Sequence, residues 1–201
     1  MAVHFGYLGH NKRGDIIFNL VNFLEIDTRG IDLLHSIRVA ELVSKLTRAL
    51  DLEDSLRHEI ILSAALHDIG KSIININILN KPGKLSHKEW NEIKLHPRYG
   101  AMLALSMGYS INVVKNILFH HENCDGTGYL KGIKEDKIPL GAAIIRICDS
   151  YDAMRSIRSY RKPVTHDEAI EDLIKNKNKY RIDLLKKFIE LDFNKLENYY
   201  K

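Results

Sequence analysis

Several features that would assign a protein to a class at once are missing from this sequence. Two cysteines in 201 residues make a disulfide framework improbable and fit a reducing cytoplasm. No apolar run approaches the roughly 18 residues of a membrane span, and the N-terminus lacks the pattern of an export signal. The formal net charge of +4 suits an anionic substrate but is too small to indicate a nucleic-acid polymer. We therefore expect a cytoplasmic protein that binds neither a membrane nor a nucleic-acid polymer.

What the sequence does have is a normal apolar content and many histidines. Its 45% hydrophobic residues are enough for a sizeable core. The hydrophobic pattern predicts helices nearly throughout, over 31–50, 54–66, 110–122 and 140–158. Capping boxes at Ser86–Glu89 and Thr165–Glu168 predict the starts of two more helices.

The segments between these helices predict loops and one domain boundary. Residues 72–85 are predicted as a loop, and the glycine-rich residues 123–139 as a long loop, either ordered or flexible. Pro97 marks either the end of the helix that starts at Ser86 or the first turn of the next helix. We expect one all-α domain over 31–201, preceded by an appended helical segment over 1–30.

Potential metal ligands occur singly or as adjacent pairs at predicted helix ends. Imidazole and carboxylate together form the ligand set of di-iron, di-manganese or zinc hydrolases. Helix ends that project into one cleft can collect such ligands from distant parts of a bundle. The candidate ligands are His35, His67, Asp68, His96, His120, His121 and Asp149.

The adjacent pair His67–Asp68 is the most informative of these. Neighbouring residues on a helix point about 100° apart, so both can reach one centre only where the helix ends and the backbone turns. The carboxylate can then bridge two cations, and two metals about 3.5–4 Å apart can hold a hydroxide that attacks phosphorus in line. Lys71, three residues later, could offset charge on the phosphate.

Each of these residues also has an ordinary explanation. His96 could be a surface residue beside a proline, and His120–His121 could be a solvated helix end. Asp149 lies in a very apolar stretch, where a buried carboxylate needs a positive partner; Arg146 or Arg155 could serve instead of a metal. We assign surface or capping roles to the other histidines, His4, His10, His58, His87 and His166. The co-occurrence of all the candidates favours a metal site.

From His35 to Arg161 the chain resembles the HD-GYP family of cyclic di-GMP phosphodiesterases, which are metal-dependent phosphohydrolases of the HD superfamily. The resemblance is carried, in order and spacing, by HSIRVAEL, HDIGK, ILNKPGKLSHKEWNEIKLHPRYGA, HHENCDGTGYL and IPLGAAIIRICDSYDAMRSIRSYRK. It implies an HD-domain helical bundle with a dinuclear metal site in a central cleft. The implied reaction hydrolyses cyclic di-GMP through a metal-bridging hydroxide, giving linear pGpG and, if it continues, GMP.

The resemblance also implies a role for each site residue. It makes the seven candidate ligands hold two divalent metal ions, iron or manganese ahead of zinc, with Asp68 as the bridge. It makes Asp68 and Lys71 the catalytic residues and Lys71 a phosphate contact. Tyr129, Arg158 and Arg161 would hold the phosphates or bases of the nucleotide, because a guanidinium can bind a phosphate at two points and stack on a base.

Three positions depart from the family pattern. Gly128-Tyr129-Leu130 replaces Gly-Tyr-Pro, which could alter contacts of the Gly128–Leu130 loop with a partner diguanylate cyclase. Ile31 stands where some members carry a glutamate for a third metal, so we predict two metals. About 30 leading residues are too few for the sensor or receiver domain that usually precedes such domains, which leaves a stand-alone hydrolase or a truncated chain. A homodimer is a further expectation.

Two other kinds of function stay open on the sequence. The first is hydrolysis of another nucleotide: a different cyclic dinucleotide, an alarmone or a nucleoside phosphate. The second is a non-catalytic module that binds a cyclic dinucleotide. The complete ligand set favours catalysis, and Tyr129, Arg158 and Arg161 favour a cyclic dinucleotide as the substrate.

The role implied for Arg158 can be tested with one substitution. Arg158→Ala should weaken substrate binding, because it removes a phosphate or base contact, and should leave the metal content unchanged. Substrate affinity and metal per chain, measured on the same preparation, check this. A fall in metal content would show that the role is misassigned.

Overall fold

The computed structural model describes residues 32–156, 162–193 and 200 of the chain. Within these ranges all regular structure is helical and no strand occurs, as the sequence predicts. No helix among the described residues is both long and apolar enough to span a bilayer. Four parts of the sequence-based predictions lie outside the described residues: the segment 1–30, Ile31, Arg158 and Arg161. Their predicted roles therefore stay predictions.

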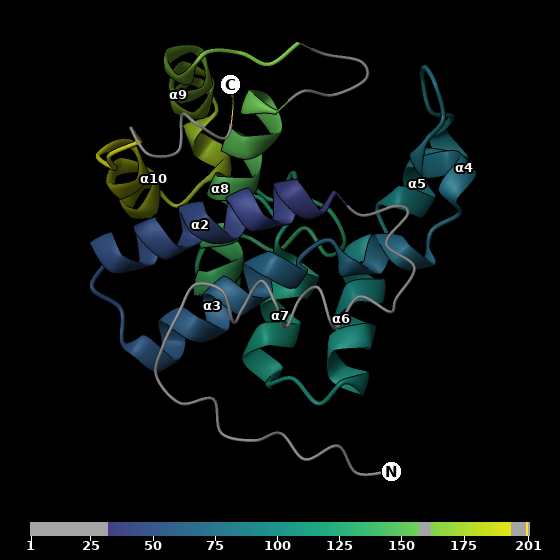
Figure 1. Cartoon of the computed structure of the whole chain (residues 1–201), viewed down its shortest axis with the longest axis horizontal. Helices are drawn as coiled ribbons and strands as arrows, with labels where there is room; N and C mark the ends of the chain where they lie inside the picture. Colours follow the sequence, from purple (N-terminus) through teal and green to yellow (C-terminus); the bar gives the residue numbers. More distant parts are fainter. Residues whose placement is uncertain (1–31, 157–161, 194–199, 201) are drawn as a thin grey trace.

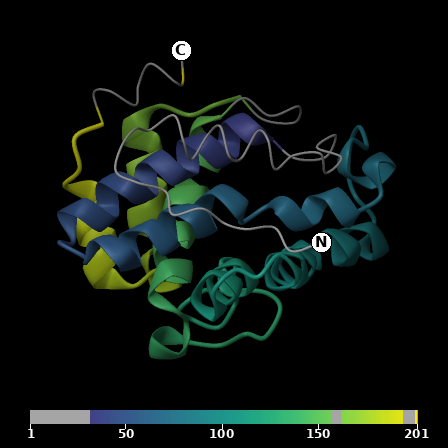
Figure 2. The same ribbon diagram turned by 60° about the horizontal axis from the view of Figure 1, so that its bottom comes forward.

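The described helices form a bundle in which α3 lies between α2 and the pair α6–α7 (Figures 1 and 2). The short helices α4 and α5 lie at one end of the molecule, beyond α6 (Figure 1). The elements, in chain order, are α2 (Leu33–Ala49), α3 (Asp54–Leu66), η1 (Ile69–Ile73), α4 (Ile76–Leu79), α5 (His87–Ile93), α6 (His96–Ser106), α7 (Ile111–Phe119), η2 (Glu135–Lys137), α8 (Leu140–Arg155), α9 (His166–Lys175), η3 (Lys177–Lys179) and α10 (Ile182–Ile189).

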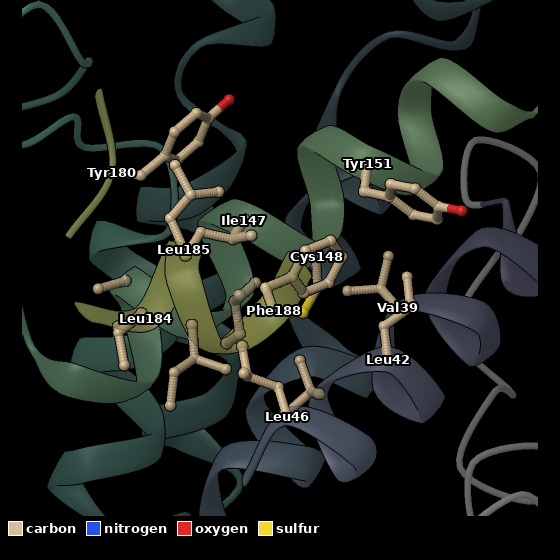
Figure 3. Close-up of a cluster of buried hydrophobic side chains, with 14 of the residues drawn as sticks. Val39, Leu42, Leu46, Ile147, Cys148, Tyr151, Tyr180, Leu184, Leu185 and Phe188 are labelled. Carbon is tan, nitrogen blue, oxygen red and sulfur yellow. The ribbon is translucent and has the colours of Figure 1, made fainter. Parts of the chain in front are cut away.

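The larger apolar cluster joins α2, α3, α8, α9 and α10. Leu42 and Leu46 of α2 and Phe188 of α10 are fully buried in it. Figure 3 shows side chains of α2, α8 and α10 pointing toward one another at this cluster. Burial of each large apolar side chain contributes about 1.5–3 kcal/mol, so this cluster holds α2 and α8 firmly together.

A smaller apolar cluster joins the end of α3 and η1 to α6 and α7. Leu66 and Ile69 flank the His67–Asp68 pair in sequence and are buried in this cluster, together with Ile117 of α7. The two residues between Leu66 and Ile69 are therefore anchored from both sides. This anchoring holds the His67–Asp68 pair in place at the end of α3.

Most of the predicted helix boundaries are confirmed. The helix predicted over 54–66 is α3, and α2 lies within the predicted 31–50. Both capping boxes form, with Ser86 and Thr165 accepting from the backbone N–H groups of Glu89 and Glu168. Pro97 occupies the first turn of α6, where the missing N–H costs nothing, so it opens that helix.

The loops differ from the prediction in two places. Residues 72–85 were expected as a loop, but Asn75 caps the short helix α4 by accepting from the N–H of Asn77. The expectation was wrong because a single helical turn is too short to show an apolar periodicity. The segment 123–139 is an ordered loop that contains η2, held by bonds such as that from the N–H of Lys131 to Glu122 Oε1 at 2.7 Å.

A close backbone approach at Gly70 joins η1 to α6. A Cβ atom on this glycine would lie 2.0 Å from the carbonyl oxygen of His96 and 2.4 Å from the backbone nitrogen of Gly100. Neither backbone atom can move without shifting α6. Gly70 therefore lets the turn after Asp68 approach the start of the helix that carries His96.

Gly70→Ala should consequently destabilise the fold. The added methyl group would force η1 and α6 apart, and we expect a loss of about 3 kcal/mol or more in the free energy of unfolding, measured by urea denaturation. Gly83→Ala is the control: it has φ +94° but no atom within 4 Å of the added Cβ, so it should lose only about 1 kcal/mol. Equal losses for the two variants would contradict this role of Gly70.

Candidate metal centre

The structure brings all seven predicted ligands together at the junction of the two apolar clusters. His35 lies in the first turn of α2, and Asp149 lies on α8. His67 ends α3 and His120 ends α7, so Asp68 and His121 follow where the backbone leaves each helix, as the sequence predicts. His96 is the first residue of α6. All except the half-buried His121 are buried.

The ligand atoms fall into two groups that share one residue. One group comprises Asp68, His96, His120 and His121, and the other His35, His67 and Asp68; within each, the ligand atoms all lie within 4.8 Å of one another. Asp68 Oδ1 lies 3.2 Å from His96 Nε2, whereas Oδ2 lies 3.5 Å from His67 Nε2. The two oxygens of one carboxylate thus face different groups, which is the arrangement of a bridging ligand.

Asp149 also contacts both groups. Its Oδ1 lies 3.1 Å from His35 Nε2, and its Oδ2 lies 3.9 Å from His121 Nδ1. The arginines considered from the sequence donate elsewhere: Arg146 to Asn123 and Ser150, and Arg155 to the carbonyl of Val164. The partners that the structure gives this carboxylate are imidazoles.

Backbone carbonyls orient three of the imidazole rings in the same way. The Nδ1 atoms of His67, His96 and His120 lie 2.7–2.8 Å from the carbonyl oxygens of the residues three positions earlier. A carbonyl can only accept, so each Nδ1 carries the proton and each Nε2 offers a lone pair. Hydrogen bonding of the second ring nitrogen is the usual support of a metal-binding histidine.

This arrangement places lone pairs against one another. His96 Nε2 and His120 Nε2 lie 3.3 Å apart, although both are acceptors in the neutral rings. In the described part of the chain, His67 Nε2 and Asp68 Oδ1 are buried without a hydrogen-bond donor. Facing acceptors repel and orphaned polar atoms are costly, and a cation between them removes both penalties. The residues therefore fit divalent metal ions.

His35 is held by two carboxylates, those of Asp149 and Asp152. No role was assigned to Asp152 from the sequence. His35 Nδ1 donates to Asp152 Oδ2 at 2.7 Å, and its Nε2 faces Asp149. Asp152 also accepts from Arg38 at 2.7 Å and from the hydroxyl of Tyr200 at 2.6 Å. Asp152 lies one helical turn after Asp149, and this spacing on one face of α8 is the signal by which the sequence could have revealed it.

The surroundings raise the pKa of His35 but lower the pKa values of three other histidines of the centre. Burial lowers the pKa of His67, His120 and His121, so these rings are neutral and available as ligands. Burial also opposes the charge on His35, but the bonds to Asp149 and Asp152 raise its pKa to about 9. Without a metal, the proton on His35 Nε2 stands where the cation would bind.

Lys71 lies against the shared carboxylate. Its ammonium group donates to Asp68 Oδ2 at 2.5 Å, and its side chain is partly exposed. Burial opposes the charge on Asp68, yet Lys71, His67 and His96 hold the pKa of this carboxyl well below its usual range. Lys71 thus places a positive charge at the edge of the centre that is open to solvent.

Tyr129 stacks on His121, with ring centroids 4.6 Å apart and an interplanar angle of 26°. Gly128 makes this possible, because a Cβ there would lie 2.4 Å from the backbone nitrogen of Asn123 and prevent the loop from folding back. Leu130 has φ +117°, which a proline cannot adopt. In this conformation the loop is therefore incompatible with the Gly-Tyr-Pro sequence of the family.

Three of the five histidines assigned to surface or capping roles are among the described residues, and all three lie outside the candidate metal centre. His58 and His87 are exposed. His166 opens α9, and its Nδ1 lies 2.8 Å from the hydroxyl of Tyr151. His4 and His10 lie outside the described residues.

Comparison with known proteins gives a family match over most of the chain. A family model described as HD domain matches residues 17–184. The match begins inside the segment 1–30, and the domain boundary at residue 31 stays a prediction.

Two curated relatives are phosphodiesterases of cyclic dinucleotides by name. A cyclic di-GMP phosphodiesterase of Pseudomonas aeruginosa is 44% identical over 68% of this chain and 33% of its own length. The 3′3′-cGAMP-specific phosphodiesterase 2 of Vibrio cholerae is 35% identical over 83% of this chain and 32% of its own length. The chain thus spans about a third of the length of these relatives.

The fold is shared with a solved structure from Bdellovibrio bacteriovorus that is described as an HDG"Y"P protein. The two chains are 23% identical, with a TM-score of 0.66 over 87% of this chain and 58% of the other. At this identity the likeness shows the fold, and it confirms the predicted helical bundle.

The protonation of His35 predicts how stability depends on pH in metal-free protein. The folded pKa of about 9 exceeds the unfolded 6.5, so the stabilisation is complete below pH 6.5 and is lost as pH rises to 9. The loss should be about 3 kcal/mol. His67, His120 and His121, with lowered pKa values in the folded chain, are nearly neutral in both states from about one pH unit above 6.5, so the slope measured between there and pH 9 comes from His35.

Urea unfolding with a chelator present, repeated between these pH values, measures this loss. Asp152→Asn should flatten the pH dependence, because it removes one of the carboxylates that raise the pKa of His35. Asp183→Asn removes an exposed carboxylate on α10 and should leave the dependence unchanged. A wild-type protein whose stability is flat over this range would contradict the assignment.

Proposed function

This chain belongs to the HD domain family, and from that premise we propose that it is a metal-dependent phosphodiesterase of cyclic dinucleotides. The observation that carries the proposal is the position of Asp68, whose two oxygens face the two groups of ligand atoms. A dinuclear centre of this kind suits in-line attack on phosphorus.

In this proposal the seven clustered residues hold two divalent ions, with Asp68 as the bridge. When bound, the ions would lower the pKa of water and stabilise charge on the phosphoryl oxygens. Imidazole and carboxylate ligands suit iron or manganese, and zinc as a third choice. Asp152 would position His35 by holding its Nδ1 proton, and Arg38 and Tyr200 would hold Asp152.

The groups that would bind the substrate lie beside the centre or follow α8 in sequence. Lys71 already rests on Asp68, so its ammonium is placed to contact a phosphate bound at the same edge. Tyr129 is stacked on His121, and burial raises the pKa of its phenol, which therefore stays a neutral hydrogen-bond donor. Arg158 and Arg161 are proposed as phosphate or base contacts on the sequence resemblance.

We propose cyclic di-GMP as the substrate, with linear pGpG as the product and GMP as the end product if a second cut follows. The resemblance of the motifs supports this choice, together with the name of the Pseudomonas relative. The name of the Vibrio cholerae relative supports 3′3′-cGAMP as the alternative substrate of the same centre. A diguanylate cyclase partner at the Gly128–Leu130 loop and a homodimer stay predictions.

The proposal is tested with protein reconstituted anaerobically with iron(II) or manganese(II). We expect two metals per chain and release of pGpG or GMP from cyclic di-GMP, resolved by chromatography. Asp68→Ala should lose the bridge, most of the metal and at least about a thousandfold in turnover. His35→Ala and His96→Ala should each affect mainly one metal, because each belongs to one group.

Asp183→Ala, on α10, is the matched control and should keep full metal content and turnover. Full activity of Asp68→Ala would rule out the proposed mechanism. Two bound metals without any product from cyclic di-GMP would refute that substrate, and 3′3′-cGAMP would be the next to test.

A further inference from the structure

The chain has a single tryptophan, Trp90, and its side chain is exposed. It lies on α5, and 44% of its surface is accessible. A large aromatic side chain in this position gains little from burial. Its exposure leaves a large aromatic surface that a ligand could contact.

Trp90 is connected to the candidate metal centre by ring contacts. Its ring centroid lies 6.4 Å from that of Tyr129, and Tyr129 in turn lies 4.6 Å from His121. Tyr129 also contacts His96 at 6.4 Å between centroids. A row of aromatic rings thus runs from an exposed indole to two of the candidate metal ligands.

The geometry of the first contact leaves part of the indole available. The planes of Trp90 and Tyr129 meet at 69°, so the rings are arranged edge to face and are not stacked. At least one face of the indole is therefore not covered by Tyr129. A flat aromatic ligand whose phosphate lies at the centre could stack on such a face.

The charge around Trp90 favours an anionic ligand. Residues 81–98 contain five lysines or arginines and two glutamates. One of these glutamates, Glu89, is already paired with Lys81 at 2.8 Å, while Lys84 and Lys88 are exposed. The segment that presents the indole is therefore net positive, as an approaching nucleotide would require.

We propose that Trp90 is a stacking platform for a nucleobase of the cyclic dinucleotide, which makes α5 part of the substrate-binding surface. The inference rests on the proposed function, because it assumes that the phosphate binds at the metal centre. It assigns to Trp90 a binding role and no part in the bond cleavage itself.

The fluorescence of Trp90 reports on stacking directly, because no other tryptophan is present. The metal-loaded protein is mixed with cyclic di-GMP in a stopped-flow instrument, and indole emission is followed before product accumulates. We expect saturable quenching by cyclic di-GMP and none by inorganic phosphate, which has no base.

Substitution supplies a second readout that needs no fluorescence. Trp90→Leu keeps an apolar side chain without an extended π face, and it should raise KM for cyclic di-GMP by about 5- to 100-fold. Its kcat and metal content should stay near those of the wild type. Trp90→Phe should recover much of the loss. Met102→Ala removes another exposed apolar side chain, 59% accessible on α6, and should change nothing.

The outcomes separate this inference from the proposed function. Product formation with unchanged emission and an unchanged KM for Trp90→Leu would overturn the stacking role and leave the phosphodiesterase standing. If cyclic di-GMP quenched the emission and Trp90→Leu bound it more weakly, but no product formed, the stacking role would be supported and hydrolysis of cyclic di-GMP would be refuted. If cyclic di-GMP caused no quenching and gave no product, both the stacking role and the proposed function would be overturned.

Discussion

The structure depends on burying a dense group of ligand atoms between two apolar clusters. Six of the seven candidate ligands are buried, and two of the six are carboxylates. Such a group is costly in a fold unless positive charge compensates it. Without metal, the protonated His35 and Lys71 supply part of that compensation, while lone pairs of His96 and His120 still face each other at 3.3 Å. Bound metal would therefore stabilise the folded chain.

The helix ends make this arrangement possible. His67 and His120 end their helices, so the residue after each can turn toward the same centre. The backbone carbonyls of the last turns hold the Nδ1 protons and aim the Nε2 lone pairs inward. Gly70 then allows the start of α6 to approach, which brings His96 within reach of Asp68. The site is thus a consequence of where helices stop.

Around this centre the structure adds two sets of contacts that lie on different sides of it. On the inner side, Asp152 joins His35 to Arg38 and Tyr200, residues that come from distant parts of the chain. On the outer side, the ordered loop after His121 places Tyr129 between the centre and α5. The inner contacts would hold a ligand in position, and the outer contacts would meet a substrate.

The sequence by itself determined the helical class, most helix boundaries and the seven clustered residues, because apolar periodicity, capping boxes and motifs are local signals. Only the tertiary structure decided that Asp149 contacts both groups of ligands, that Asp152 supports His35, and that Trp90 reaches Tyr129. Each of these depends on contacts between segments far apart in the chain; the spacing of Asp149 and Asp152 marks one face of α8, but it does not identify the partner of Asp152. The sequence pattern also failed to predict the turn α4 and the positive φ of Leu130, because one residue or one helical turn carries no periodicity.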